Sequence, residues 1–196
     1  MRDNNKIKFF IFTFLSFSLI ILLAACKKDE NVINNDEPLP KWKNIEIGFN
    51  NNYKSIFFIN EITGYAVGNS YPNDSSKIIK TTNGGQNWFT SFTAVTSVNL
   101  AAIFFVNLNT GFAAGNEEII IKTTNGGLDW FLSNFNGINP ITCIAFFDEN
   151  NGIASGYNSL MLRTANGGAS WQSVPLLTQG NLYSFSILNN QGEAFT

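Results

Sequence analysis

The chain of 196 residues is long enough for one domain with a hydrophobic core, and its composition restricts what that domain can be. Hydrophobic residues make up 44%, aromatic residues 14% and charged residues only 13%, with 19 Phe and 16 Gly, which favours β-structure joined by tight turns. The net charge of −2 argues against nucleic-acid binding, which needs clustered Lys and Arg, so no nucleic-acid partner is predicted. The absence of histidine excludes the most common general base and metal ligand.

Residues 1–25 have the organisation of an export signal. A charged head, MRDNNKIK, precedes 17 residues without a charge, Phe9 to Ala25. A transmembrane anchor is the alternative, because this length lies at the lower limit for spanning ~30 Å of hydrocarbon. The residues LAAC, Leu23 to Cys26, resemble the lipobox of bacterial lipoproteins. This resemblance implies cleavage before Cys26 and acylation of its thiol.

Cys26 and the residues after it predict where the mature protein is located. Two or three acyl chains anchor a protein stably, whereas one binds only marginally, so acylated Cys26 makes the membrane a predicted partner. Lys27 to Glu30 resemble the signal that sends lipoproteins of Bacteroidota to the outer face of the outer membrane; an ordinary solvated tether is the alternative. We predict an exported, surface-exposed lipoprotein of the outer membrane with a flexible tether at residues 26–41.

A polar octapeptide that ends in tryptophan occurs three times. It reads TTNGGQNW from Thr81, TTNGGLDW from Thr123 and TANGGASW from Thr164. The tryptophans are 42 and 41 residues apart, a period typical of the four-stranded blade of a β-propeller.

The remainder of each repeat unit follows the same order. An apolar run such as IFFI or AIFFV comes first and favours a strand buried on both faces. A short strand then begins at Gly64, Gly111 or Gly152, a third strand precedes the octapeptide, and a fourth begins at the tryptophan. A buried helix is the competing interpretation of the apolar runs, but the β-branched and aromatic content favours strands.

The octapeptide predicts a tight turn between the third and fourth strands. Asn tolerates a left-handed conformation and bonds its own backbone, and Gly accepts positive φ freely. The Thr hydroxyl can satisfy amides of the turn, and Trp can bury its ring against the adjoining sheet. The predicted structural turn residues are Thr82, Asn83, Gly84, Gly85 and Trp88; Thr124, Asn125, Gly126, Gly127 and Trp130; and Thr164, Asn166, Gly167, Gly168 and Trp171.

These repeats resemble the Asp-box, or bacterial neuraminidase repeat, with Asn where that family often has Asp. With the preceding F-x(6–7)-G-x-A element, the chain is most similar to propellers of the photosystem II assembly-factor and sortilin types. The resemblance covers Trp42 to Thr196 and implies an all-β fold, a β-propeller of four-stranded antiparallel blades. It leaves the function open, because such propellers serve many purposes.

The repeat boundaries predict about three and a half blades. The predicted blades are residues 54–92, 98–132 and 141–174, with half a blade at 183–196 and a closing outer strand at 42–47. Because propellers usually close with four to eight blades, we expect a C-terminally truncated fragment of a longer propeller; a self-associating half-ring is the alternative.

The sequence offers little catalytic chemistry. A sialidase needs an arginine cluster, whereas the only arginines are Arg2 and Arg163. The pairs Glu117–Glu118 and Asp148–Glu149 are predicted to be solvated turn charges, and the oxygen-rich stretch 69–77 a mobile loop rather than a calcium site. Cys143 is predicted to be a buried, unreactive thiol. We therefore predict no catalytic residues, no metal and no cofactor.

The resulting prediction is a non-catalytic surface lipoprotein whose propeller is a protein-interaction or assembly scaffold. Its partner is an unknown protein or glycan. The alternative is a glycan-binding or sialidase-like glycoside hydrolase whose active residues lie in missing blades.

Overall fold

A computed structural model of the chain describes residues 51–70, 75–94, 98–133, 137–177, 179–187, 194 and 195. All of them belong to one compact unit that spans Ile45–Thr196. The predicted signal peptide, Cys26, the tether and the strand at residues 42–47 lie outside the described residues.

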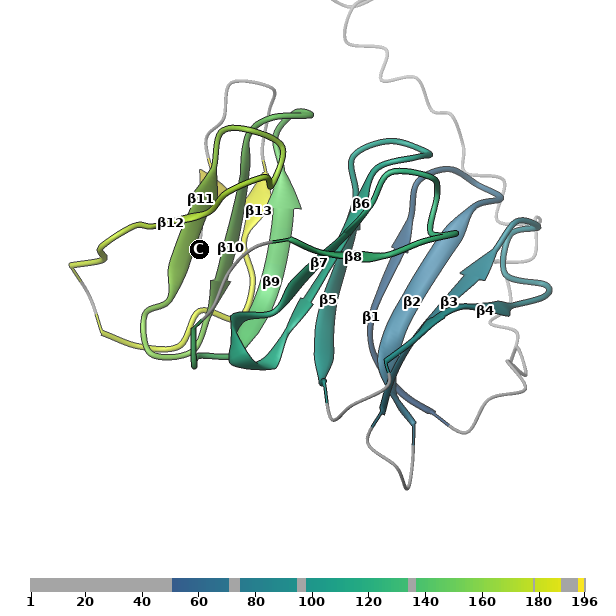
Figure 1. The fold of residues 1–196 in the computed structure, drawn as a ribbon, viewed down its shortest axis with the longest axis horizontal. Helices are drawn as coiled ribbons and strands as arrows, with labels where there is room; N and C mark the ends of the chain where they lie inside the picture. The colour runs from purple at the N-terminus through teal and green to yellow at the C-terminus, as the bar shows by residue number, and fades with distance from the viewer. Residues whose placement is uncertain are drawn as a thin grey trace, which may run out of the picture. The chain divides into compact units, whose positions relative to one another are not determined.

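Three four-stranded antiparallel sheets make up most of the described chain (Figure 1). In each sheet the strands pair in chain order. The first sheet contains β1 (Asn51–Phe58), β2 (Gly64–Ser70), β3 (Ser75–Thr81) and β4 (Phe89–Thr93); the second contains β5 (Leu100–Phe105), β6 (Gly111–Gly115), β7 (Ile120–Thr123) and β8 (Phe131–Ser133); and the third contains β9 (Ile141–Phe146), β10 (Gly152–Gly156), β11 (Met161–Thr164) and β12 (Gln172–Ser173).

Two short elements complete the description. A 3-10 turn, η1 (Asn116–Glu118), joins β6 to β7, and a two-stranded pair, β13 (Ser186–Ile187) and β14 (Ala194–Phe195), follows the third sheet. The fold is therefore almost entirely β, and the predicted all-β propeller fold class is confirmed. The fourth strands begin at Phe89, Phe131 and Gln172, one residue after each tryptophan.

The second strand of each sheet begins at the predicted glycine, and the structure shows why. A Cβ atom on Gly111 would lie 2.5 Å from the ring of Phe105, the last residue of the first strand, because this ring lies flat over the glycine. The same approach recurs between Gly152 and Phe146. Glycine is needed here for space rather than for an unusual backbone angle.

The prediction that the first strands are buried on both faces is wrong for β1 and correct only in part for the others. Intermediate and exposed side chains alternate along β1, whereas every residue of β6 and β10 is buried. The first strand is an edge of its sheet, while the second lies between two neighbours. The second strands fit this position because they carry small residues, such as GFAAG in β6.

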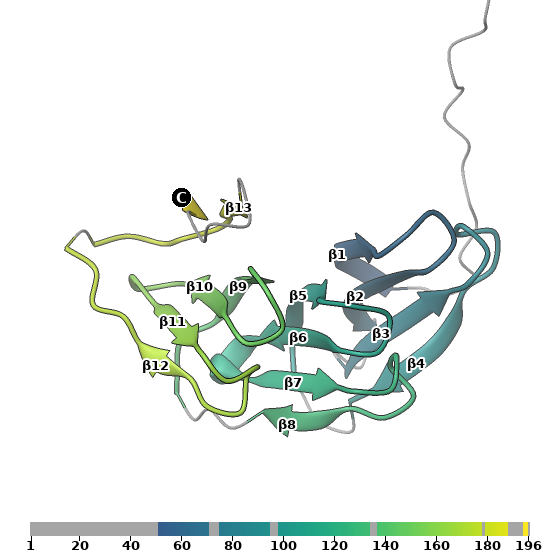
Figure 2. The same cartoon turned by 90° about the horizontal axis from the view of Figure 1, so that it is seen from above.

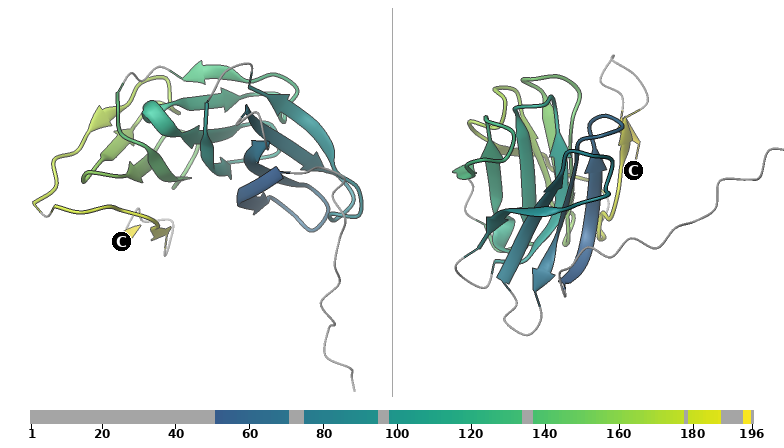
Figure 3. Two further views of the ribbon diagram at one scale, coloured as in Figure 1. Left: turned by 90° about the horizontal axis from the view of Figure 1, so that it is seen from below. Right: turned by 90° about the vertical axis from the view of Figure 1, so that its right-hand side faces the viewer.

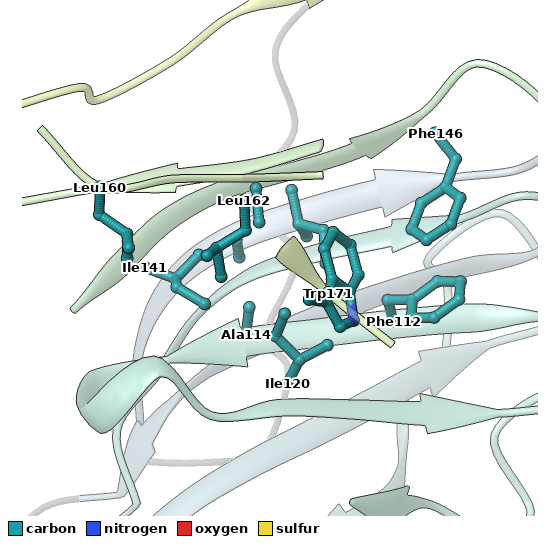
Figure 4. Close-up of a cluster of buried hydrophobic side chains, with 11 residues drawn as sticks. Phe112, Ala114, Ile120, Ile141, Phe146, Leu160, Leu162 and Trp171 are labelled. Carbon is teal, nitrogen blue, oxygen red and sulfur yellow. The ribbon is translucent and has the colours of Figure 1, made fainter. Parts of the chain in front are cut away.

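The cores lie between successive sheets, which follow one another with their faces in contact (Figures 2 and 3). Tyr65 of the first sheet stacks on Phe105 of the second, with ring centroids 3.7 Å apart. Phe112 of the second sheet stacks on Phe146 of the third at 4.1 Å, in a cluster that also contains Ile120, Leu162 and Trp171 (Figure 4). Each interface thus contains a closely stacked ring pair.

The other face of the first sheet is much more exposed than its counterparts. Ile56 and Phe58 are 62% and 41% exposed, whereas the equivalent Ile103 and Phe105 in β5 are 4% and 2% exposed. The difference arises because the first sheet covers Ile103 and Phe105, and no described sheet covers β1 in the same way.

Candidate functional site

The antiparallel order of the strands divides the connections between two opposite edges of the sheets. We call the edge with the first-to-second and third-to-fourth connections the turn rim, because it carries the three Asn-Gly-Gly turns. The loop rim is the opposite edge, where second strands join third strands and one sheet leads to the next. Its described parts include residues 116–119, 137–140, 157–160 and 179–183.

One buried hydroxyl organises each turn of the turn rim. Thr123 Oγ1 accepts hydrogen bonds from the backbone N–H groups of Gly127 (2.9 Å) and Asn125 (3.3 Å) and donates to Asn125 Oδ1. That Oδ1 also accepts from the N–H of Asp129 at 2.9 Å. The same pattern is formed by Thr81 with Asn83 and by Thr164 with Asn166.

The structure changes two assignments within the predicted turns. The buried hydroxyls belong to Thr81 and Thr123, whereas the neighbouring Thr82 and Thr124 are exposed. Asparagine was expected to tolerate a left-handed backbone, but only the glycines have positive φ, for example 67° at Gly126. Asparagine instead accepts and donates side-chain hydrogen bonds across the turn, which leaves the left-handed positions to Gly.

The tryptophans pack on their own sheets, and Trp130 and Trp171 also contact the preceding sheet. The ring of Trp130 lies edge-on against Phe105, with centroids 5.9 Å apart, and Trp171 packs in the same way on Phe146. Trp130 Nε1 donates to Ser91 Oγ of the first sheet at 3.3 Å. Trp88 has no such partner among the described residues, and its Nε1 donates to Gly85 O within its own turn.

Each of the second and third turns is bound by side chains of the preceding sheet, a contact that the sequence did not reveal. Lys80 Nζ donates to Gly126 O at 2.8 Å, and Lys122 Nζ donates to Gly167 O at 2.7 Å. Ser91 donates to Gly127 O and Ser133 to Gly168 O. The octapeptide therefore joins adjacent sheets as well as closing a hairpin.

Burial shifts the pKa of two side chains that make these contacts, Tyr65 and Lys80. It raises the pKa of Tyr65 to about 12, so this hydroxyl remains protonated and donates to Gly126 O at 2.9 Å. Burial also lowers the pKa of Lys80, whose ammonium donates to the same carbonyl and lies 5.3 Å from the centroid of the Tyr65 ring.

Replacing Lys122 with methionine should lower the free energy of unfolding by about 1–2 kcal/mol, because a charge-assisted hydrogen bond to Gly167 O and a contact with the Phe112 ring are lost. Arg163→Met is the matched control, since Arg163 occupies the equivalent position in β11 and is exposed. Urea denaturation measures both. Equal effects of the two substitutions would contradict the assigned inter-sheet contact.

The loop rim differs from the turn rim in having left-handed residues other than glycine. Glu117 and Glu118 have φ of 54° and 53°, and Asn158 and Ser159 have φ of 55° and 59°. Such angles are costly for residues with a Cβ atom and occur most often where the surroundings compensate for them.

The prediction that the Glu117–Glu118 pair is solvated is wrong for Glu118, which is only 4% exposed. Its carboxylate accepts hydrogen bonds from the backbone N–H and the Nδ2 of Asn139, at 3.2 and 3.3 Å, and it lies directly over Gly137. Glu118 thereby connects η1 to the segment that leads into the third sheet. Asn158 Nδ2 extends this network by donating to Asn139 Oδ1 at 2.8 Å.

Replacing the exposed Glu117 with glycine should raise the free energy of unfolding by about 1 kcal/mol, because glycine adopts positive φ without the strain of a Cβ atom. Glu149→Gly is the control: Glu149 is exposed in a turn and is not among the positive-φ residues, so the substitution should be neutral or slightly destabilising. Thermal unfolding measures the difference, and a lower melting temperature for Glu117→Gly would contradict the backbone argument.

A pocket of about 450 Å³ opens on the loop rim beside the β10–β11 turn. It is lined by Asn158, Ser159, Leu176, Gln179, Gly180 and Asn181. The exposed rings of Tyr157 and Tyr183 lie close by, edge to face, with centroids 5.9 Å apart. Asn181 Nδ2 donates to the Tyr183 hydroxyl at 3.2 Å, which links the ring to the pocket. None of the described lining residues carries a charge.

The structure also shows the surroundings of the other candidate residues that were named from the sequence. Asp148 and Glu149 are exposed, as predicted; the pKa of Asp148 is lowered by hydrogen bonds, chiefly from the side chain of Asn151. Cys143 is partly buried, and burial raises the pKa of its thiol. Much of the stretch 69–77 belongs to β2 and β3 rather than to a loop, and residues 71–74 lie outside the described chain.

The described residues contain neither a metal-binding cluster nor a membrane-spanning helix. Among them, no group of three or more Asp, Glu, Cys or His side chains is arranged to bind a metal. In the same part of the chain, no helix is long and apolar enough to cross a membrane.

The sheets and their turn contacts define a protein of the β-propeller class with Asn-Gly-Gly turns. Residues 35–140, more than half of the chain, match the family of the photosynthesis system II assembly factor YCF48. The chain therefore belongs to that family. No curated protein matches its sequence.

Solved structures share the fold. YCF48 bound to D1 peptide superimposes with a TM-score of 0.58 and 21% identity over 66% of this chain and 42% of that one. YCF48 from Cyanidioschyzon merolae gives 0.57 and 18%, over 73% and 47%. An ancestral GH74 enzyme gives 0.51 and 17%, over 66% and 19%. The present chain thus spans less than half the length of these structures, and the likeness concerns the fold alone.

Proposed function

We propose that the protein is a non-catalytic binding scaffold on the cell surface, anchored to the outer membrane through acylated Cys26 and recognising a protein partner with its loop rim. The observation that carries this proposal is the family membership, because the family is that of an assembly factor. One of the similar structures is of YCF48 bound to a D1 peptide, which supports a protein as the class of partner.

The difference between the two rims favours the loop rim as the recognition surface. The carbonyls of the second and third turns of the turn rim are already engaged by Lys80, Lys122 and the serines of the preceding sheets. Both rims present exposed apolar side chains, such as Leu108 and Leu128 on the turn rim. On the loop rim, however, the exposed Leu177 and Tyr183 adjoin residues that line a pocket. Exposed apolar groups beside polar ones are typical of interaction sites.

Site-specific photo-crosslinking in cells that express the full chain tests the assignment. A benzophenone amino acid at Leu177 of the loop rim should give a discrete crosslinked protein. The same probe at Leu128 is the matched control, because Leu128 is also a strongly exposed leucine but lies on the turn rim. Crosslinking at Leu128 alone, or at neither position, would contradict the proposal.

Palmitate labelling tests the anchor separately. The full chain should incorporate labelled palmitate and fractionate with the outer membrane, and Cys26→Ala should lose both properties. Cys143→Ala is the control for the other cysteine and should keep them. Labelling that persists in Cys26→Ala would rule out this lipid attachment.

A further inference from the structure

We propose that the pocket beside the β10–β11 turn binds an uncharged saccharide. This inference goes beyond the scaffold function and does not depend on a protein partner. The pocket has a volume of about 450 Å³, and its described lining consists of amide and hydroxyl side chains, one glycine and one leucine. Amide groups both donate and accept, as sugar hydroxyls do, and a lining without charge selects a neutral ligand.

Several polar atoms of the lining remain free to bind a ligand. Within the part of the chain that the structure describes, the exposed Gln179 amide makes no hydrogen bond to protein. Asn181 Nδ2 uses one hydrogen for Tyr183 and retains a second. Asn158 donates from Nδ2 to Asn139, while its Oδ1 remains available as an acceptor.

Three backbone N–H groups of the pocket, those of Asn158, Ser159 and Gly180, are already engaged. The N–H of Asn158 donates to Asn181 Oδ1 at 3.1 Å, and the N–H of Ser159 donates to Gly180 O at 2.6 Å. The N–H of Gly180 donates to Ser159 Oγ at 2.9 Å. These three N–H groups are therefore not available to pair with the main chain of an extended peptide, whereas the free amide side chains can bind the hydroxyl groups of a saccharide.

Tyr157 and Tyr183 complete the site. Their rings meet at 76°, and both are exposed, Tyr183 to 64%. This edge-to-face arrangement leaves ring surface available for the C–H face of a sugar, while the Tyr183 hydroxyl is oriented by Asn181. The left-handed residues Asn158 and Ser159 and their hydrogen bonds fix the pocket before a ligand arrives, which reduces the entropic cost of binding.

An array of neutral hexose and N-acetylhexosamine oligosaccharides, probed with the full chain, tests the inference; the best binder is then titrated in solution by calorimetry. Tyr183→Ala and Asn181→Asp should each weaken binding by about tenfold or more, through loss of the ring surface and of an amide donor. Gln179→Ala provides a third variant at an exposed position.

Gln172→Ala and Asn87→Asp are the matched controls, since both residues are exposed and neither lines the pocket, and they should leave the affinity unchanged. Circular dichroism confirms that each variant is folded. Failure to bind any array member, or equal binding by the pocket variants and the wild type, overturns the saccharide inference. Neither result affects the crosslinking test of the scaffold function.

Discussion

Replacing Phe112 with alanine is expected to lower the free energy of unfolding by about 3–5 kcal/mol, the largest effect of any substitution considered. Phe112 is fully buried and stacks on Phe146 across the interface between the second and third sheets. Its ring also fills the space above Gly168, where a Cβ atom would lie only 2.5 Å from it. The substitution therefore leaves a cavity shared by two sheets.

Phe131→Ala is the control, because it removes the same side chain from a position on β8 that is 63% exposed. Its expected effect is within about 0.5 kcal/mol. Chemical denaturation monitored by tryptophan fluorescence measures both variants. A loss below roughly 1 kcal/mol for Phe112→Ala would show that the ring pair does not stabilise the interface as described.

Replacing Thr123 with valine is expected to cost about 2–3 kcal/mol, although the two side chains have nearly the same shape. The buried hydroxyl accepts from the N–H groups of Gly127 and Asn125, so its removal leaves a buried donor without a partner. The carbonyls of this turn also accept from Lys80 and Ser91, so the damage extends to the contact with the first sheet.

Thr124→Val separates the effect of the hydroxyl from the effect of valine in a turn. Thr124 is adjacent and exposed, so this substitution should change the stability by no more than about 0.5 kcal/mol. Hydrogen exchange adds a local measurement: the Gly127 amide should lose protection in Thr123→Val and keep it in Thr124→Val. Unchanged protection at Gly127 in the Thr123 variant would contradict the hydrogen-bond assignment.

The features that recur with the repeat could be predicted from the sequence. Each second strand begins at its predicted glycine, because the preceding phenylalanine ring needs the space that a Cβ atom would take. The Asn-Gly-Gly turns were predicted for a similar reason, since two successive left-handed positions call for glycine. Local steric requirements of this kind can be predicted directly from the residue types.

The features that could not be predicted depend on residues distant in sequence. The carboxylate of Glu118 reaches Asn139, 21 residues later, and Lys80 reaches a carbonyl 46 residues later. Charge suggested exposure for Glu118, because charged residues are buried only where specific partners exist. The pocket was missed too, since its lining comes from a turn and from a later segment with no shared motif.

The contacts between sheets have a consequence for how the protein opens. Lys80 and Lys122 each reach only into the following sheet, so every sheet is stabilised by itself and by its immediate neighbours. Of the three sheets, the middle one shares a ring stack with a partner on either side. Thermal fluctuations should therefore detach the flanking sheets first, and β5–β8 should be the last part of the described chain to lose its order.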